Sequence, residues 1–258
     1  MTNYLHKVLP PQYSHVNKVY CLLAATVFCA LPLCSTEAAA ENILKYDGTT
    51  NIHGNAKTWA AKNEYDGIDI RVTGVDGGYY TDTTEALVLN NQTLNVKGKG
   101  KFVSIINTAQ NKQIDNNGGI YAKGGSTVNF TDVDSIYIAA IAGKEGGNDS
   151  TVISAKDPGR DLTGYTNIVN ISGTTVQLIG SIDVMHSLGS VFFNRNARHT
   201  VNAALSGSDS FWYGSAIGET DERTTVNLSL ADGATWIFNA GKSTLNAGGI
   251  IRNLKLDK

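Results

Sequence analysis

Asp132 and Asp134 are the two carboxylates of this sequence best spaced for acid–base chemistry or for calcium binding. Alternate side chains of a strand project from the same face, so the two groups would stand together if they share a strand. The short motifs Asn-Thr-Asp, Asp-Asp, Gly-His-Gly and Arg-Ile-Lys, which mark hydrolases of acidic polysaccharides, are all missing. A solvated strand face is therefore the favoured interpretation of both residues.

Four other polar segments have simpler explanations than chemistry. The segments Asp66-Gly67-Ile68-Asp69 and Asp76-Gly77-Gly78 have the composition of turns. Gly146-Gly147-Asn148-Asp149 lacks the spacing of the calcium-binding nonapeptide and occurs once. Gly241-Lys242-Ser243 matches the end of a phosphate-binding loop, but Trp236 occupies the position of its first glycine. We expect no cofactor from these segments.

The histidines after residue 40 are His53, His186 and His199, and none has a second ligand four residues away. Surface or turn positions are therefore favoured over metal ligation. No cysteine and no Gly-x-Ser-x-Gly motif follows residue 40, which leaves no thiol nucleophile and no serine elbow. The sequence thus predicts no catalytic, cofactor-binding or metal-binding residues and favours a non-enzyme.

Two features remain open to a binding role. Phe211-Trp212-Tyr213 could form an exposed patch that grips sugar rings, although core packing is the commoner fate of aromatic side chains. An inserted loop around Lys144–Thr163, with Pro158-Gly159, is the preferred place for ligand contacts. The formal net charge of −2 argues against a nucleic-acid partner, because phosphate binding needs clustered lysine and arginine.

A triplet that ends in asparagine recurs through the chain. Thr93-Leu94-Asn95 is its first copy, and the asparagines recur at intervals of 34, 41, 32, 25 and 19 residues, at positions 95, 129, 170, 202, 227 and 246. Repeats of about this length are typical of solenoids, in which each unit buries its apolar face against its neighbours.

The repeated units have the pattern of strands. In residues 225–230, Val226, Leu228 and Leu230 share one face, while Thr225, Asn227 and Ser229 share the other. Glycine pairs such as Gly118-Gly119 and Gly124-Gly125 are expected as turns. A right-handed parallel β-helix of roughly ten coils is favoured over a β-sandwich, because stacked coils align like residues into side-chain ladders.

The first 40 residues have the pattern of a secretory signal peptide. Lys7 and Lys18 precede an apolar run that ends in a small-residue stretch, which predicts a helical signal cleaved after Ala40. Either Met1 or Val16 could be the true start. The predicted organisation is a signal peptide at residues 1–40 and a β-helix at residues 41–258.

The segment from Thr225 to Trp236, followed by Ser243-Thr244-Leu245-Asn246, resembles the passenger region of Gram-negative autotransporters (type V secretion). That resemblance implies a pectin-lyase-like β-helix at the cell surface or outer membrane, or released outside the cell, as an adhesin-like stem. It further implies a C-terminal outer-membrane barrel as partner, and host or neighbouring-cell glycans or proteins as targets. Because the chain stops at Lys258 without barrel-like strands, we expect a truncated or fragmentary gene product.

Two alternatives stay open beside the adhesin-like stem. One is a secreted β-helix polysaccharide lyase or hydrolase, and the other is a soluble carbohydrate-binding module. The sequence does not name an adhesion target or an oligomeric state.

Overall fold

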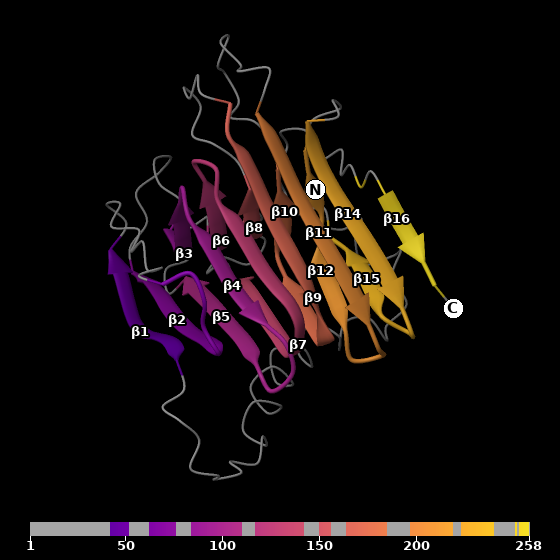
Figure 1. Ribbon diagram of the computed structural model, residues 1–258, viewed down its shortest axis with the longest axis horizontal. Helices are drawn as coiled ribbons and strands as arrows, with labels where there is room; N and C mark the ends of the chain where they lie inside the picture. The colour runs from indigo at the N-terminus through magenta and orange to yellow at the C-terminus, as the bar shows by residue number, and fades with distance from the viewer. Residues whose placement is uncertain are drawn as a thin grey trace, which may run out of the picture. The chain divides into compact units, whose positions relative to one another are not determined.

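The computed structural model describes residues 42–51, 62–75, 84–109, 117–141, 150–155, 164–184, 197–218, 223–239, 251 and 253–257. All regular structure in these residues is β-strand, and every pairing between strands is parallel. An all-β fold with parallel sheets is thus confirmed (Figure 1). The predicted signal peptide and its cleavage after Ala40 lie outside the described residues.

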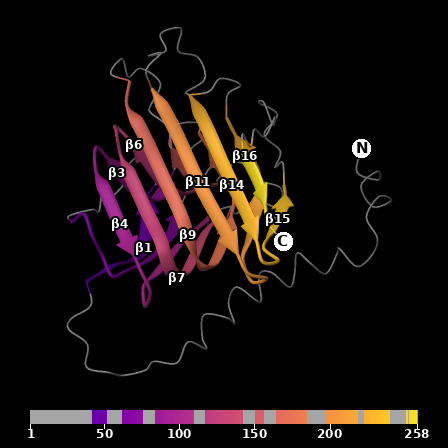
Figure 2. The ribbon, with the colours of Figure 1, turned by 45° about the vertical axis from the view of Figure 1, so that its right-hand side comes forward.

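The pairing divides the strands into three stacks. The first stack contains β4 (Thr93–Lys97), the first half of β7 (Thr127–Ile141), the first half of β9 (Thr166–Ile179), β11 (Arg198–Ser206), β14 (Thr224–Ala231) and β16 (Asn253–Leu256). Its strands lie side by side in Figure 2.

The second stack contains β1 (Ile43–Asn51), β2 (Gly67–Val75), β5 (Phe102–Ala109), the second halves of β7 and β9, β12 (Phe211–Gly214) and β15 (Thr235–Phe238). The third stack contains β3 (Thr84–Asn90), β6 (Asn117–Lys123), β8 (Thr151–Ala155), β10 (Ser181–Asp183) and β13 (Ala216–Ile217). From β4 to β15 the chain visits the stacks in the fixed order first, second, third.

The two longest strands turn the corner between the first and second stacks without a loop. In β7 the pairing register shifts between Phe130 and Val133, and Asp132 adopts a left-handed φ of 58° at the bend. In β9, Gly173 passes so close to β7 that a Cβ there would lie 2.7 Å from the carbonyl oxygen of Val133. A glycine is required at this corner because the neighbouring backbone leaves no room for a side chain.

The core consists of rows of inward-pointing side chains, and each row contains the equivalent residue from successive strands of a stack. In the first stack, strand register aligns Val128, Val169, Val201 and Val226, all fully buried. Val226 and Leu228 face this core, while Thr225, Asn227 and Ser229 alternate with them, as the sequence predicts. Period-two alternation therefore sets which residues remain available on the outer faces.

Two sequence-based expectations about local structure are wrong. Gly118-Gly119 lies within the strand β6 and forms no turn. Glycine is needed there because a Cβ on Gly119 would lie only 2.5 Å from the carbonyl oxygen of Val152 in β8. The segment Lys144–Thr163 is not one loop, because its residues 151–155 form β8 in the third stack. By contrast, Gly124 and Gly125 form the expected turn, with φ values of 63° and 87°.

Candidate functional site

The outer face of the first stack carries a row of asparagine side chains, one from each strand. Strand register aligns Asn95, Asn129, Asn170, Asn202, Asn227 and Asn253. We call this row the amide ladder. It confirms the predicted alignment of the asparagines from position 95 to position 227. Its last member is Asn253, whereas the repeat pattern had predicted Asn246, which lies outside the described residues.

Each amide of the ladder donates from Nδ2 to the Oδ1 of the preceding asparagine. The donor–acceptor distances are 2.9 Å from Asn129 to Asn95, 2.7 Å from Asn170 to Asn129 and 2.7 Å from Asn202 to Asn170. They are 2.6 Å from Asn227 to Asn202 and 2.7 Å from Asn253 to Asn227. Asn95 ends the series by donating to the backbone carbonyl of Asn63 over 3.0 Å.

The ladder uses only half of each amide. An asparagine side chain has two N–H donors and two acceptor lone pairs, and the inner members use one of each within the row. The ladder residues from Asn95 to Asn227 are partly exposed, and Asn253 is exposed. The outer side of the row therefore presents a repeating set of hydrogen-bonding groups to solvent.

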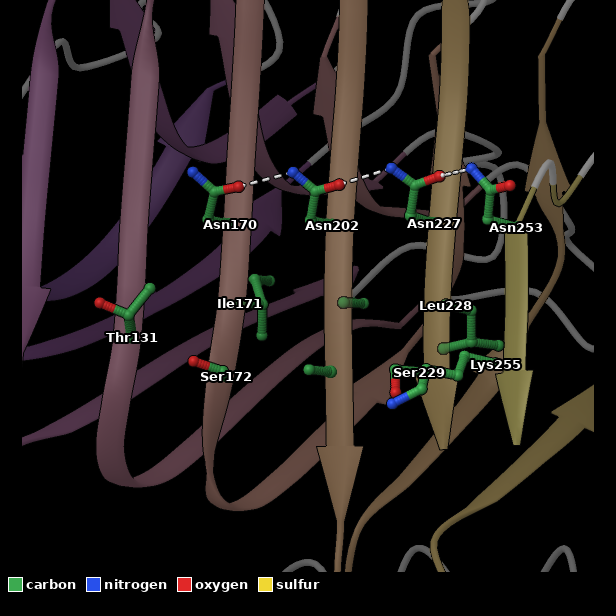
Figure 3. A pocket seen from close by; sticks show the side chains of 12 residues that line it. Thr131, Asn170, Ile171, Ser172, Asn202, Asn227, Leu228, Ser229, Asn253 and Lys255 are labelled. Atoms are coloured by element: carbon green, nitrogen blue, oxygen red, sulfur yellow. Dashed lines mark hydrogen bonds between the residues drawn. The ribbon is translucent and has the colours of Figure 1, made fainter. Parts of the chain in front are cut away.

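A hollow of about 370 Å³ lies beside this row, and we call it the amide groove. In Figure 3 the ladder amides form one side of the groove. The other side is formed by residues two positions after each asparagine, such as Ser172 and Ser229. The lining residues come from β7, β9, β11, β14 and β16: Thr131, Asn170, Ile171, Ser172, Asn202, Ala203, Ala204, Asn227, Leu228, Ser229, Asn253 and Lys255. The groove thus runs across the strands, parallel to the ladder.

Asp132 and Asp134 both lie exposed at the bend of β7. The backbone N–H of Asp132 donates to Ser172 Oγ over 3.2 Å, and Asp134 Oδ2 accepts from the backbone N–H of Gly100 over 3.0 Å. These contacts tie adjacent strands at the corner, so a structural role accounts for the position of both residues.

Asp66 joins three segments at the start of β2. Its Oδ2 accepts a hydrogen bond from the backbone N–H of Asn42 over 3.2 Å, and its Oδ1 lies 3.1 Å from Lys101 Nζ. The hydrogen bond from Lys101, with that from Asn42, lowers the pKa of Asp66 below its ordinary value. Asp69 points outward from β2 and lies 3.5 Å from Arg71 Nε. The turn expected for residues 66–69 therefore gives way to a strand from Gly67 onward.

His199 is fully buried, so the expected surface or turn position is wrong for this residue. It occupies the inward position of β11 two residues before Val201, and its Nδ1 lies 3.1 Å from Asn167 Nδ2. Among the described residues, no group of three or more histidine, cysteine, aspartate or glutamate side chains is arranged to hold a metal ion.

The aromatic segment in β12 is divided between core and surface. Trp212 is fully buried, stacks on Trp236 with ring centroids 5.3 Å apart, and donates from Nε1 to the carbonyl of Gly180 over 2.9 Å. Phe211 and Tyr213 point the other way and are partly exposed. Core packing is therefore confirmed for the tryptophan alone.

Several sequence candidates lie outside the described residues: His53, His186, Asp76-Gly77-Gly78, Gly146-Gly147-Asn148-Asp149 and Gly241-Lys242-Ser243. The residues beside the ladder in the amide groove were not singled out from the sequence. They could have been found by aligning the repeated asparagines, because the residue two positions after each asparagine lies on the same outer face of its strand.

Comparison of the chain with protein-family models, with curated proteins and with solved structures finds no match. In the part of the chain that the structure describes, no helix has the length and hydropathy to cross a membrane.

Proposed function

We propose that residues 41–258 form a right-handed parallel β-helix that acts as the non-catalytic, adhesin-like stem of an exported autotransporter passenger. The observation that carries this proposal is the amide ladder. It links six strands in one register although the intervals between its members range from 25 to 41 residues. Loops of variable length between strands of fixed register are typical of stacked coils.

The pairing pattern supports a β-helix over the β-sandwich that the sequence left open. Sandwiches are built from antiparallel strands with Greek-key connections, whereas every pair in the described residues is parallel. The repeated order of first, second and third stack gives each turn of the chain three strands. The core rows then run along the stack, so each coil buries its apolar side chains against the next.

A binding role fits the outer surface better than catalysis does. The carboxylates that could have formed an acid–base pair, Asp132 and Asp134, lie at the strand bend, where Asp134 holds the backbone of Gly100. Apart from Lys255, the described residues that line the amide groove are uncharged, and the surface that they present to it is mostly apolar. Such a surface suits the binding of a ligand and supplies no acid–base pair.

Export and display can be tested together in a Gram-negative host. The chain would be produced with an autotransporter outer-membrane barrel fused after Lys258 and with an internal epitope in the exposed segment around Lys99. Its amino terminus would be determined by mass spectrometry. Removal of residues 1–40 and antibody labelling of intact cells are the expected results. Retention in the cytoplasm with residues 1–40 intact would overturn the proposal. Cleaved protein found only in the medium would instead favour the soluble binding module.

A further inference from the structure

The amide groove has the length and composition of a site for a linear polymer. It crosses five consecutive strands of the first stack, from β7 to β16. At the usual spacing of about 4.8 Å between strands, four intervals give a length of about 19 Å. A volume of about 370 Å³ is within the usual range of ligand sites, and the length fits several units of an extended chain.

The wall of the groove repeats with the strand spacing. Asn170, Asn202 and Asn227 each use one N–H and one lone pair within the ladder, so a second N–H and a second lone pair remain on each amide. An extended β-linked sugar chain has a unit length close to the strand spacing and carries hydroxyls that both donate and accept. Successive sugars could therefore meet successive amides.

The opposite side of the groove is small and mostly uncharged. Ala204 lies at its centre, between Ser172 and Ser229 on the neighbouring strands. Among the described residues that line the groove, none is a carboxylate, and Lys255 at the β16 end is the one with a charged side chain. The accessible surface of the groove is mostly apolar and suits the C–H faces of sugars, while the ladder amides stand along one edge, where the hydroxyls of a bound sugar would lie. A neutral ligand also avoids the cost of taking a charge out of water.

We propose that the amide groove binds an extended, neutral, β-linked polysaccharide whose axis follows the amide ladder. This inference deepens the adhesin-like role proposed above, and it rests on that role only for the claim that the ligand is met outside the cell. Acidic polysaccharides and peptides are the competing ligand classes, and the test below separates them.

The test measures binding of the purified protein to cellohexaose, xylohexaose and chitohexaose by calorimetry. Maltohexaose, which is α-linked, an oligogalacturonate and an extended Ser/Thr-rich peptide serve as comparison ligands. Ala204→Glu places a long charged side chain at the centre of the groove, from an exposed position that faces away from the core. Thr93→Glu adds the same charge to the same outer face, on β4, outside the groove.

At least one β-linked neutral oligosaccharide should bind, and Ala204→Glu should weaken it about tenfold or more while Thr93→Glu leaves it within about twofold. Ala204→Gln repeats the test with a neutral side chain should the charged variant fail to fold, which thermal melting reports. Absence of binding to all three oligosaccharides, tighter binding of oligogalacturonate or peptide, or equal effects of the two glutamate variants would overturn the inference. Because export is measured separately, a displayed protein that binds no sugar would count against the groove alone.

Discussion

Asn167 and His199 form a hydrogen-bonded pair that is fully buried at the corner between the third and first stacks. The Oδ1 of Asn167 accepts from the backbone N–H groups of Gly125 and Ser126, over 2.9 Å and 3.0 Å. Its Nδ2 must therefore face His199 Nδ1, 3.1 Å away. Since Nδ2 can only donate, Nδ1 accepts, and the proton of the neutral imidazole lies on Nε2.

We predict that His199 is neutral in the folded protein, with its proton on Nε2, and that nitrogen NMR shifts of the ring will show this tautomer. Protonation of Nδ1 would place two donors against each other.

The matched control is His199→Gln, whose side-chain oxygen can still accept from Asn167. Its free energy of unfolding should stay within about 1 kcal/mol of the wild-type value, because the hydrogen bond with Asn167 is kept. A ring protonated at Nδ1 in the neutral folded protein would show that the amide of Asn167 is oriented the other way.

The middle of the amide ladder should matter more than its end. Asn202→Ala removes hydrogen bonds to Asn170 and Asn227, and we expect it to lower the free energy of unfolding by about 1–3 kcal/mol. Asn253→Ala removes only the bond to Asn227 at an exposed position, so its cost should stay below about 1 kcal/mol. Urea denaturation measures both values, and equal losses would contradict the prediction that the middle of the ladder matters more than its end.

A charge placed in the core row should disrupt the fold, whereas the same charge one residue away should not. Leu228→Asp buries an unpaired carboxylate, because Leu228 is only 2% exposed, and should cost at least about 3 kcal/mol. Ser229→Asp points outward from the same strand and should change stability by no more than about 0.5 kcal/mol. Similar melting curves for wild type and Leu228→Asp would contradict the register of β14.

The contact between Lys101 and Asp66 predicts a measurable titration shift. Lys101→Ala should raise the pKa of Asp66 toward its ordinary value, because it removes the largest cause of the lowering. Since the folded pKa is the lower one, the contribution of Asp66 to stability is present above the unfolded pKa and is lost as the pH falls through the folded pKa. Carboxyl NMR titration measures the shift. Lys62→Ala is the control, since Lys62 contacts the Asn42 side chain over 2.8 Å, and an equal shift in both variants would argue against a specific pair.

Alternation and repetition predicted most of the fold. The outward and inward parity of residues 225–230 was readable from the sequence, and so was the alignment of the asparagines as far as Asn227. The same alternation places His199, two residues before Val201, on the inward face of its strand and therefore in the core. A histidine breaks the apolar pattern of the strand, and its partner Asn167 lies on a different strand, so no other local feature of the sequence indicates burial.

Other features depend on contacts between strands that are far apart in the sequence, and they leave no local signal. Gly118-Gly119 matched a turn by composition, but the close approach of β8 makes glycine necessary there within a strand. Asn246 follows the Thr-Leu-Asn pattern more closely than Asn253 does, yet Asn253 stands in register with Asn227. The amide groove likewise combines side chains from five strands, so its residues become neighbours only through the pairing register.

The amide ladder also has a direction. All five of its internal hydrogen bonds run from Nδ2 on one strand to Oδ1 on the strand before it, so the six side-chain dipoles point the same way. Aligned amide dipoles add, as they do along a helix, and leave partial charges of opposite sign at the two ends. The oxygen-bearing, negative end is at Asn253, which points its oxygen away from Asn227 in Figure 3. Lys255 lies two residues further on the same strand, where the field of the whole row favours a positive charge.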